Sequence, residues 1–169
     1  MQVFETERLI LRRLDLEDAA FMLELATEPA WRRFIGDRGI HDLDSARGYL
    51  ERGPLELYRR LGFGLYRVEL KDAGTPIGIC GLIKRDALQE ADLGFAFLSR
   101  HQGHGYALEA AAATLDHGRR DLKLGRIAAI TDPENARSIR LLEKLGFHYV
   151  ETGQFTPDGA VSRYYVHDA

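Results

Sequence analysis

Hydrophobic and polar positions along the first third of the chain predict one strand and then two helices. Residues 9–13 favour an opening strand, and residues 15–27 place apolar side chains at helical spacing until Glu28-Pro29 stops the pattern. A second helix is predicted over residues 44–60, with Gly53-Pro54 as a kink or a break. This part of the chain therefore predicts a β-α-α beginning.

The middle of the chain changes to strand patterns. Residues 65–70 and 76–83 are predicted strands, and the turn residues 72–74 between them favour a hairpin. A polar connection leads to a third strand-like run over residues 92–98. Three consecutive strands are therefore expected in one sheet.

An alanine-rich segment over residues 106–122 predicts a long helix. Leu108, Leu115 and Leu122 fall seven residues apart and form one apolar face. The run 126–131 that follows has four consecutive apolar residues, 127–130, as in a strand buried on both sides.

The last third predicts a short helix over residues 135–145, which Gly146 would end in the C′ position. Two closing strands are expected near residues 147–155 and 160–166. The order β-α-α-β-β-β-α-β-α-β-β indicates a mixed α/β sheet, and 169 residues suit a single domain over residues 1–169.

Composition excludes several classes of protein. A net charge of −3 argues against a general nucleic-acid binder. The single cysteine, Cys80, excludes an internal disulfide, and its apolar surroundings favour a buried, inert thiol. No paired Cys/His spacing suggests a metal site, and no apolar run approaches the ~20 residues that span a membrane. The first residues do not resemble a signal peptide, so a cytoplasmic location with no membrane partner is expected.

The segment 100–107, Arg-His-Gln-Gly-His-Gly-Tyr-Ala, joins a predicted strand to the long helix. Gly103 and Gly105 leave the backbone open to close approach, and the first amides of a helix lack internal partners. Such a turn suits a phosphate or pyrophosphate group, although an ordinary glycine turn is an alternative reading. The segment lacks a Walker lysine, and Leu108 stands where a dinucleotide fingerprint needs a third glycine.

The spacing Arg-x-x-Gly-x-Gly instead resembles the coenzyme A pyrophosphate loop of the GCN5-related N-acetyltransferase (GNAT) superfamily. Segments 7–12, 92–110 and 135–147 resemble its ribosomal-protein N-terminal alanine acetyltransferase branch. The resemblance covers nearly the whole chain. It implies a twisted, mostly antiparallel mixed sheet of six to seven strands, flanked by four helices and splayed between the fourth strand (92–98) and the fifth (126–131).

The resemblance also implies acetyl-CoA as cosubstrate, with no metal. Backbone atoms of Phe97 and Leu98 would hold the pantetheine arm and the acetyl carbonyl. The pyrophosphate would lie against the loop residues Arg100, Gly103, His104, Gly105, Tyr106 and Ala107.

Two polar residues of the 135–145 helix are the candidate catalytic groups. By the resemblance, Asn135 would contact the pantetheine or acetyl region, and Ser138 would approach the thioester sulfur. Asn135 is equally expected as a helix N-cap, and Ser138 as a solvated hydroxyl in the first turn. The helix has no tyrosine to serve as the acid, which leaves Ser138 or water.

The need for a general base depends on the acceptor. A terminal α-amine, with a pKa of roughly 7.7–8.0, is partly neutral at cellular pH, whereas a lysine near ~10.4 is almost fully charged. Asp92 is the first candidate for a base that relays through water, and Glu90 is the second; a solvated carboxylate is the alternative for both. Glu109, in the first turn of the long helix, most simply complements the helix dipole.

Residues that border the acceptor are harder to place. The resemblance points to the first two helices and the last hairpin, and so to a set of rim candidates that are otherwise ordinary core or surface residues: Trp31, Phe34, Lys84, Arg85, Tyr164 and Tyr165. The Lys84-Arg85 pair would suit an acidic acceptor.

The leading hypothesis is an N-acetyltransferase acting on a protein N-terminus or a small amine. The alternative is a non-catalytic acyl-CoA-binding or regulatory module with the same fold. A kinase or nucleotide enzyme is disfavoured because the turn has neither a Walker lysine nor a cluster of metal-binding acids. Both a monomer and a homodimer are compatible with the sequence.

Overall fold

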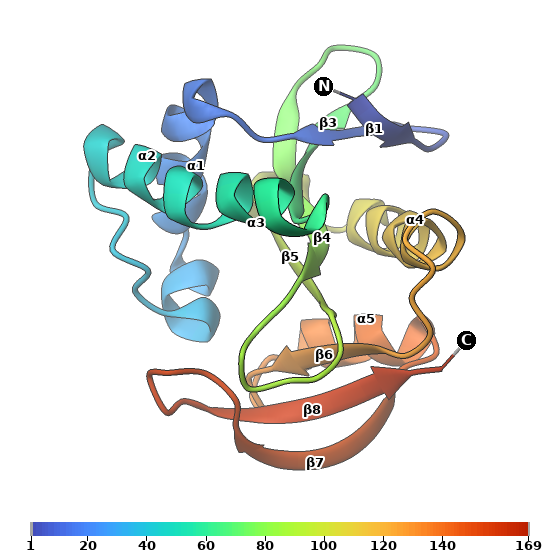
Figure 1. Cartoon of the computed structure of the whole chain (residues 1–169). Helices are drawn as coiled ribbons and strands as arrows, with labels where there is room; N and C mark the ends of the chain where they lie inside the picture. Colours follow the sequence, from blue (N-terminus) through green and yellow to red (C-terminus); the bar gives the residue numbers. More distant parts are fainter. Residues whose placement is uncertain (1, 169) are drawn as a thin grey trace.

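A computed structural model describes residues 2–168 and places eight strands in one sheet, in the order β1-β2-β3-β4-β5-β6-β8-β7 (Figure 1). Neighbouring strands are antiparallel except β5 and β6, which are parallel. The strands are β1 (Gln2–Glu5), β2 (Leu9–Arg13), β3 (Leu65–Leu70), β4 (Pro76–Ile83), β5 (Asp92–Phe97), β6 (Ile127–Thr131), β7 (His148–Gln154) and β8 (Val161–His167). The predicted mixed, mostly antiparallel sheet is confirmed.

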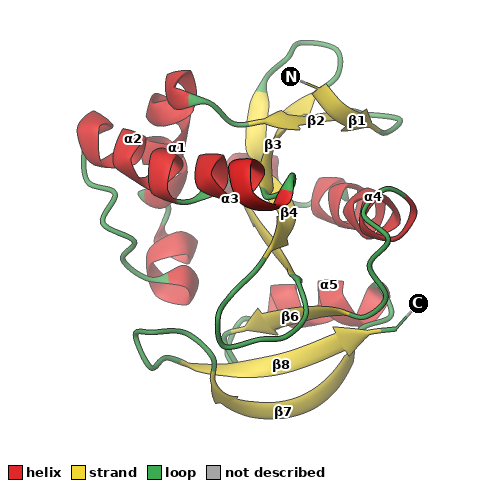
Figure 2. Cartoon of the chain, in the orientation of Figure 1, coloured by secondary structure: helices red, strands yellow, loops and turns green. Residues whose placement is uncertain are grey.

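Helices cover both faces of this sheet (Figure 2). The α-helices are α1 (Ala19–Ala26), α2 (Leu43–Arg52), α3 (Pro54–Leu61), α4 (Tyr106–Arg120) and α5 (Ala136–Lys144), with a π-helical turn at Trp31–Ile35 and short 3-10 turns at Leu16–Asp18 and Ser99–His101. Figure 1 shows α1, α2 and α3 on one side of the central strands and α4 on the other. Within residues 2–168, none of the helices has the length and apolar character to cross a membrane.

The counts differ from the expected six to seven strands and four helices. The additional strand, β1, has only four residues and no alternating pattern that would distinguish it in the sequence. The additional helix arises because Gly53-Pro54 breaks the segment 44–60 rather than bending it. Gly53 follows α2 with non-helical dihedrals, and Pro54 occupies the first position of α3, where its missing N–H leaves no helical bond unmade.

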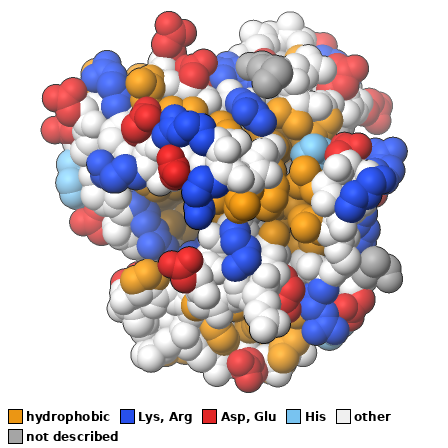
Figure 3. Space-filling model, viewed as in Figure 1, with side chains coloured by type: hydrophobic (Ala, Val, Ile, Leu, Met, Phe, Trp, Pro, Cys, Tyr) orange, Lys and Arg blue, Asp and Glu red, His pale blue; other side chains and the backbone are white. Residues whose placement is uncertain are grey.

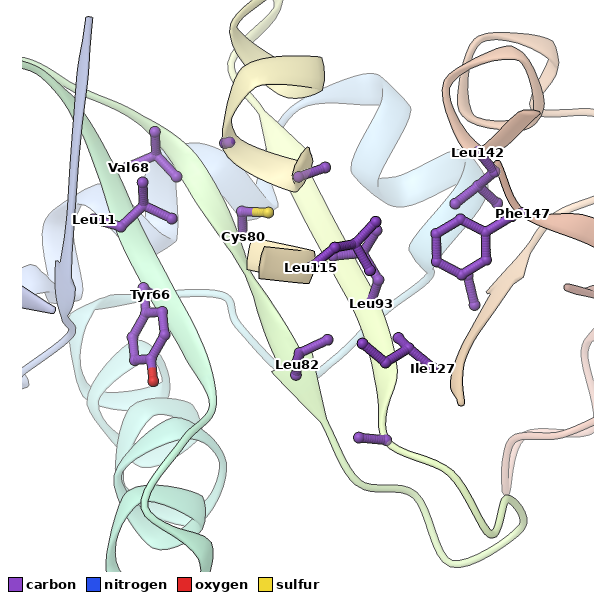
Figure 4. Close-up of a cluster of buried hydrophobic side chains, with 14 of the residues drawn as sticks. Leu11, Tyr66, Val68, Cys80, Leu82, Leu93, Leu115, Ile127, Leu142 and Phe147 are labelled. Carbon is purple, nitrogen blue, oxygen red and sulfur yellow. The ribbon is translucent and has the colours of Figure 1, made fainter. Parts of the chain in front are cut away.

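Two hydrophobic clusters hold the helices against the sheet. One contains alanines and Leu115 of α4 together with β-strand residues such as Tyr66 and Cys80 (Figure 4). The other joins α1 and α2 to the opposite face through residues such as Met22 and Leu50. Cys80 is fully buried, as predicted, and burial raises the pKa of its thiol to about 12.

The sheet opens between β5 and β6. Their register contains a single pair, Asp92 with Ala128, and the Ala128 amide donates to the Ala91 carbonyl at 2.9 Å. Beyond this point the two strands diverge, as Figure 1 shows. The splay lies at the predicted position, between residues 92–98 and 126–131.

Candidate active site

A cavity of about 490 Å³ occupies the space where β5 and β6 diverge. Phe95 and Phe97 of β5, Ile130 of β6 and Ser138 of α5 line it, and the turn that carries Trp31 reaches it from the helical side. Figure 3 shows a hollow with hydrophobic atoms inside it and basic side chains near its edge. Parts of the chain far apart in sequence therefore form one space.

The open edge of β5 presents the main-chain groups of alternate residues. The Ala91 carbonyl faces β6, whereas the Leu98 amide donates to Ile77 of β4 at 2.9 Å. Because main-chain groups alternate sides along a strand, those of Phe95 and Phe97 face the splay. The Phe97 carbonyl accepts a bond from the Gln102 side chain on this edge (3.3 Å).

Leu98 does not offer the groups that the resemblance assigned to it. Its amide is bonded to Ile77, its carbonyl accepts from the His101 amide at 3.0 Å, and its side chain is fully buried. The sequence predicts that Leu98 belongs to this strand. It does not predict which way the N–H and C=O groups of Leu98 point. Phe95, two residues before Phe97, has the required orientation instead.

The glycine turn leaves five amides unused. Gly103 and Gly105 have positive φ angles of 86° and 81°, and Gly105 is the N-cap of α4. Within residues 2–168, no hydrogen bond uses the N–H groups of residues 103–107, and the first helical bond runs from Glu109 to the Gly105 carbonyl. A row of free amides at the positive end of a helix dipole is suited to an anion.

Arg100 lies beside this turn but its guanidinium bonds elsewhere. Nη1 of Arg100 lies 2.9 Å from Oε2 of Glu24 in α1, and both side chains are exposed. Its role in binding the coenzyme stays a prediction.

Arg8 and Glu109 tie the glycine turn to the β1–β2 connection. Nε of Arg8 lies 2.7 Å from Oε1 of Glu109, and Nη1 of Arg8 donates to the His104 carbonyl at 2.9 Å. Oε2 of Glu109 accepts from the Arg8 amide and the Thr6 hydroxyl, and the Arg8 guanidinium lies 4.6 Å from the Tyr106 ring centre. We call this set of contacts the Arg8–Glu109 clamp.

The charge of Glu109 therefore does more than complement the helix dipole. Burial raises the pKa of Glu109, but hydrogen bonds from Thr6 and Arg8 outweigh it, so its pKa is lowered. The carboxylate stays ionised and holds Arg8 against the turn.

Glu109→Gln is expected to weaken coenzyme A binding about three- to tenfold, because the turn loses a charged anchor that fixes its amides. Global stability should change little, since Arg8 is 43% exposed and ion pairs between exposed side chains contribute little to stability. Isothermal titration calorimetry of coenzyme A with Glu109→Gln, Arg8→Gln and the double variant measures how far the Arg8–Glu109 pair contributes to coenzyme A affinity. Unchanged affinity in all three would show that the clamp does not position the turn.

Asn135 and Ser138 both line the cavity. Oδ1 of Asn135 accepts from the Ser138 amide at 3.2 Å and caps α5, so the N-cap interpretation is confirmed. The Ser138 side chain is buried in the cavity wall, and its hydroxyl makes no hydrogen bond to another residue of the described range. It is therefore available to a ligand.

Neither candidate base lines the cavity. Asp92 is 1% exposed, and its two carboxylate oxygens lie 3.3 and 3.2 Å from Nε of Arg85. Burial raises the pKa of Asp92 to about 6, although the charges of Arg85 and Lys84 act in the opposite direction. Glu90 accepts a hydrogen bond from the Tyr164 hydroxyl at 2.7 Å. A catalytic role for either carboxylate stays a prediction.

The rim candidates divide into two groups. Trp31, Phe34 and Arg85 line the cavity. In contrast, the Lys84 ammonium donates to the carbonyls of Arg85 and Leu88, Tyr164 is bonded to Glu90, and Tyr165 is buried in the core.

Arg38 and Tyr49 also line the cavity and were not among the candidates. Arg38 follows the π-helical turn in an irregular segment, and Tyr49 is one of several aromatic residues on predicted helices. Neither position has a periodic or motif signal that would distinguish it. Only the packing of α2 and this segment beside β4 brings them to the cavity.

Comparison with known proteins agrees with this geometry. A family model described as an acetyltransferase (GNAT) domain matches residues 8–148. The uncharacterized protein YkkB of Bacillus subtilis is 41% identical over 150 residues, covering 87% of this chain and 86% of its own. The uncharacterized N-acetyltransferase p20 of Bacillus licheniformis is 32% identical over 149 residues, covering 87% and 83%.

A solved structure of RimL, a ribosomal L7/L12 α-N-protein acetyltransferase in complex with coenzyme A, has the same fold. Its TM-score is 0.83 with 99% of this chain and 98% of that chain covered, at 15% identity. The family model, the curated relatives and the shared fold agree: the chain belongs to the GNAT family and is an acetyltransferase.

Proposed function

We propose that the protein transfers an acetyl group from acetyl-CoA to a primary amine, by direct attack while both substrates are bound. One observation carries this proposal: the splay cavity lies between the unpaired edge of β5 and Ser138, and it reaches Ala107 at the end of the glycine turn. A single space can therefore hold a thioester and an incoming nucleophile.

The coenzyme would bind along the splay. The pyrophosphate would accept hydrogen bonds from the free amides of residues 103–107, and the pantetheine arm would pair with the Phe95 and Phe97 main chain as an added strand would. The presence of coenzyme A in the RimL complex, which has the same fold, supports coenzyme A as the ligand. No metal takes part in the proposed reaction.

The chemical step needs a neutral amine. Its nitrogen forms a bond to the acetyl carbon, the carbon–sulfur bond breaks, and the thiolate takes a proton from Ser138 or water. The main-chain N–H groups of Phe95 or Phe97 would stabilise the oxyanion of the intermediate. The amine proton leaves to water, and Ser138, where it is the donor, takes a proton back from water.

The cavity favours an α-amine over a lysine side chain. Its lining carboxylates, Glu28 and Asp132, already accept hydrogen bonds from the amides of Ser99 and Glu134. Because an α-amine with a pKa of roughly 7.7–8.0 is partly neutral at cellular pH, it needs no strong base. The acceptor would be a protein N-terminus or a small molecule with such an amine.

Ser138→Ala is expected to lower kcat about tenfold to a hundredfold while coenzyme A affinity stays nearly constant, if Ser138 protonates the leaving thiolate. Steady-state rates and calorimetry on the same preparation separate the two effects. Ser138→Thr, which keeps a hydroxyl, should retain more activity than alanine. Equal turnover in wild type and Ser138→Ala would assign the proton to water.

Release of free thiol from acetyl-CoA, measured against a panel of amines and peptides, tests the function itself. Turnover with at least one amine, and the acetyl group found by mass on the acceptor nitrogen, would support the transferase. Tight coenzyme binding without turnover on any acceptor would instead favour the non-catalytic acyl-CoA-binding module.

A further inference from the structure

Three arginines line the cavity: Arg137 in the first turn of α5, and Arg38 and Arg85 beside aromatic side chains. Arg38 and Arg85 line it together with Trp31, Phe34 and Tyr49. An arginine beside aromatic side chains is weakly screened by water, and its charge acts strongly on a ligand that displaces that water. The arrangement suits one end of an acceptor molecule.

Arg85 has hydrogen-bonding capacity left after its contact with Asp92. Its hydrogen bond to Asp92 uses Nε, and within residues 2–168 neither Nη1 nor Nη2 of Arg85 makes a hydrogen bond. The two Nη groups are therefore free to donate to a carboxylate, which is the geometry in which arginine binds this group best.

Arg38 makes no hydrogen bond or ion pair to another residue in the described range 2–168. The charge of Arg38 acts on Asp158 in the β7–β8 turn, but the Thr156 hydroxyl and the Ala160 amide, which also lower the pKa of Asp158, are its bonded partners. The half-buried guanidinium of Arg38 thus lacks a bonded anion of its own.

The negative charges of the cavity wall do not compensate these arginines. Glu28 accepts from the amide and hydroxyl of Ser99, and Asp132 accepts from the Glu134 amide. Both carboxylates thus face main-chain donors that stabilise their charge locally. The positive charge of Arg38 and the Nη groups of Arg85 are left for a ligand.

The strand register gives the approximate distance that an acceptor must span between the acetyl group, held near Phe95, and the guanidinium of Arg85. The guanidinium of Arg85 contacts the Asp92 carboxylate, and Phe95 lies three residues along β5 from Asp92. At 3.3 Å per residue this is about 10 Å. A short molecule with its amine at the acetyl group can therefore bring a second group to Arg85.

We propose, building on the function above, that the acceptor is a primary amine that also carries a carboxylate, and that Arg38 and Arg85 bind this carboxylate. A free amino acid and an acidic peptide N-terminus both present this chemistry.

The experiment compares acceptors that differ only in the carboxylate. One arm uses amino acids against their carboxamides, and the other uses tripeptides with Asp or Glu in the first two positions against Asn or Gln. Thiol release from acetyl-CoA gives kcat/KM for each. We expect the carboxylate member to be favoured at least about tenfold in one arm, and that arm identifies the source of the carboxylate.

Arg38→Gln should remove most of this preference by raising KM for the carboxylate acceptor, while leaving KM for acetyl-CoA unchanged. Arg47→Gln is the matched control, because it removes the same charge from the exposed surface of α2, where Arg47 pairs with Asp44. Arg85→Lys keeps the charge next to Asp92 and loses the paired Nη donors, so it tests Arg85 without leaving a buried carboxylate alone.

The outcomes separate this inference from the function on which it rests. Turnover with equal kcat/KM for carboxylate and carboxamide acceptors in both arms would overturn the inference and leave the transferase intact. A preference that survives in both Arg38→Gln and Arg85→Lys would also overturn it. Absence of turnover on every amine, with coenzyme A still bound, would overturn both.

Discussion

Replacing Gly105 with valine is expected to raise the dissociation constant for coenzyme A by about two orders of magnitude. Gly105 has a φ of 81°, where a β-branched residue is strongly disfavoured, and an added Cβ would lie 3.4 Å from Nη2 of Arg8. The turn must change conformation, so the amides around it lose their common direction. Loss of two charge-assisted hydrogen bonds, at about 1.5 kcal/mol each, accounts for the expected factor.

The matched control is Gly74→Val in the turn between β3 and β4. Gly74 also has a positive φ, of 68°, and its Cβ would meet no heavy atom within 4 Å. Similar backbone strain is thus introduced far from the cavity. We expect both variants to lose thermal stability to a similar degree, and only Gly105→Val to lose binding in calorimetry. Equal coenzyme affinity in the two would show that the turn does not bind the pyrophosphate.

The sequence predicts well those features that depend on short-range pattern. The strand at Leu65–Leu70 has the predicted bounds because alternation and flanking turns define it within a few residues. The glycine turn could be found because two residues that tolerate positive φ stand at the junction of a strand and a helix. The position of the splay came from the resemblance and is confirmed by the single β5–β6 register pair.

Features that depend on direction or on long-range packing could not be predicted. Leu98 and Phe95 are both apolar residues of the predicted strand 92–98, and only the hydrogen bond from Leu98 to Ile77 shows which main-chain groups face the splay. Likewise, nothing near Glu109 in sequence indicates its bonds to Arg8 and Thr6, about a hundred positions earlier. Side-chain partners across such separations are fixed by the tertiary structure.

The same limit explains why Asp92 looked like a simple candidate base. At the start of a strand that leads to the acetyl site, a carboxylate is expected to meet solvent. The structure instead buries it beside Arg85, so its ionisation is coupled to the stability of the fold. Asp92→Asn should move the pH–rate profile toward higher pH if Asp92 relays the proton, and an unmoved profile leaves it a structural role.

The pH dependence of stability tests the environment of Asp92 more directly. The expected change of the unfolding free energy with pH has the opposite sign to that of most carboxylates. The pKa of Asp92 is raised from 3.8 to about 6 by burial, so between these values the folded protein holds a proton that the unfolded chain has released. Raising the pH through this window therefore destabilises the fold, with a total effect of about 3 kcal/mol. The free energy of unfolding of wild type minus that of Asp92→Asn should fall from about pH 4 to pH 6 and then level off.

Asp18→Asn provides the control. Asp18 is also buried, but hydrogen bonds from Arg12, the Asp15 amide and Arg67 outweigh its burial and lower its pKa. The stabilisation that Asp18 provides is present above its ordinary pKa and is lost as the pH falls through the lowered one. The difference between wild type and Asp18→Asn should therefore rise with pH in the acidic range. Denaturant titrations from about pH 2 to about pH 7 cover the windows of both carboxylates. A flat difference for Asp92→Asn would mean that Arg85 fully offsets the burial of its partner.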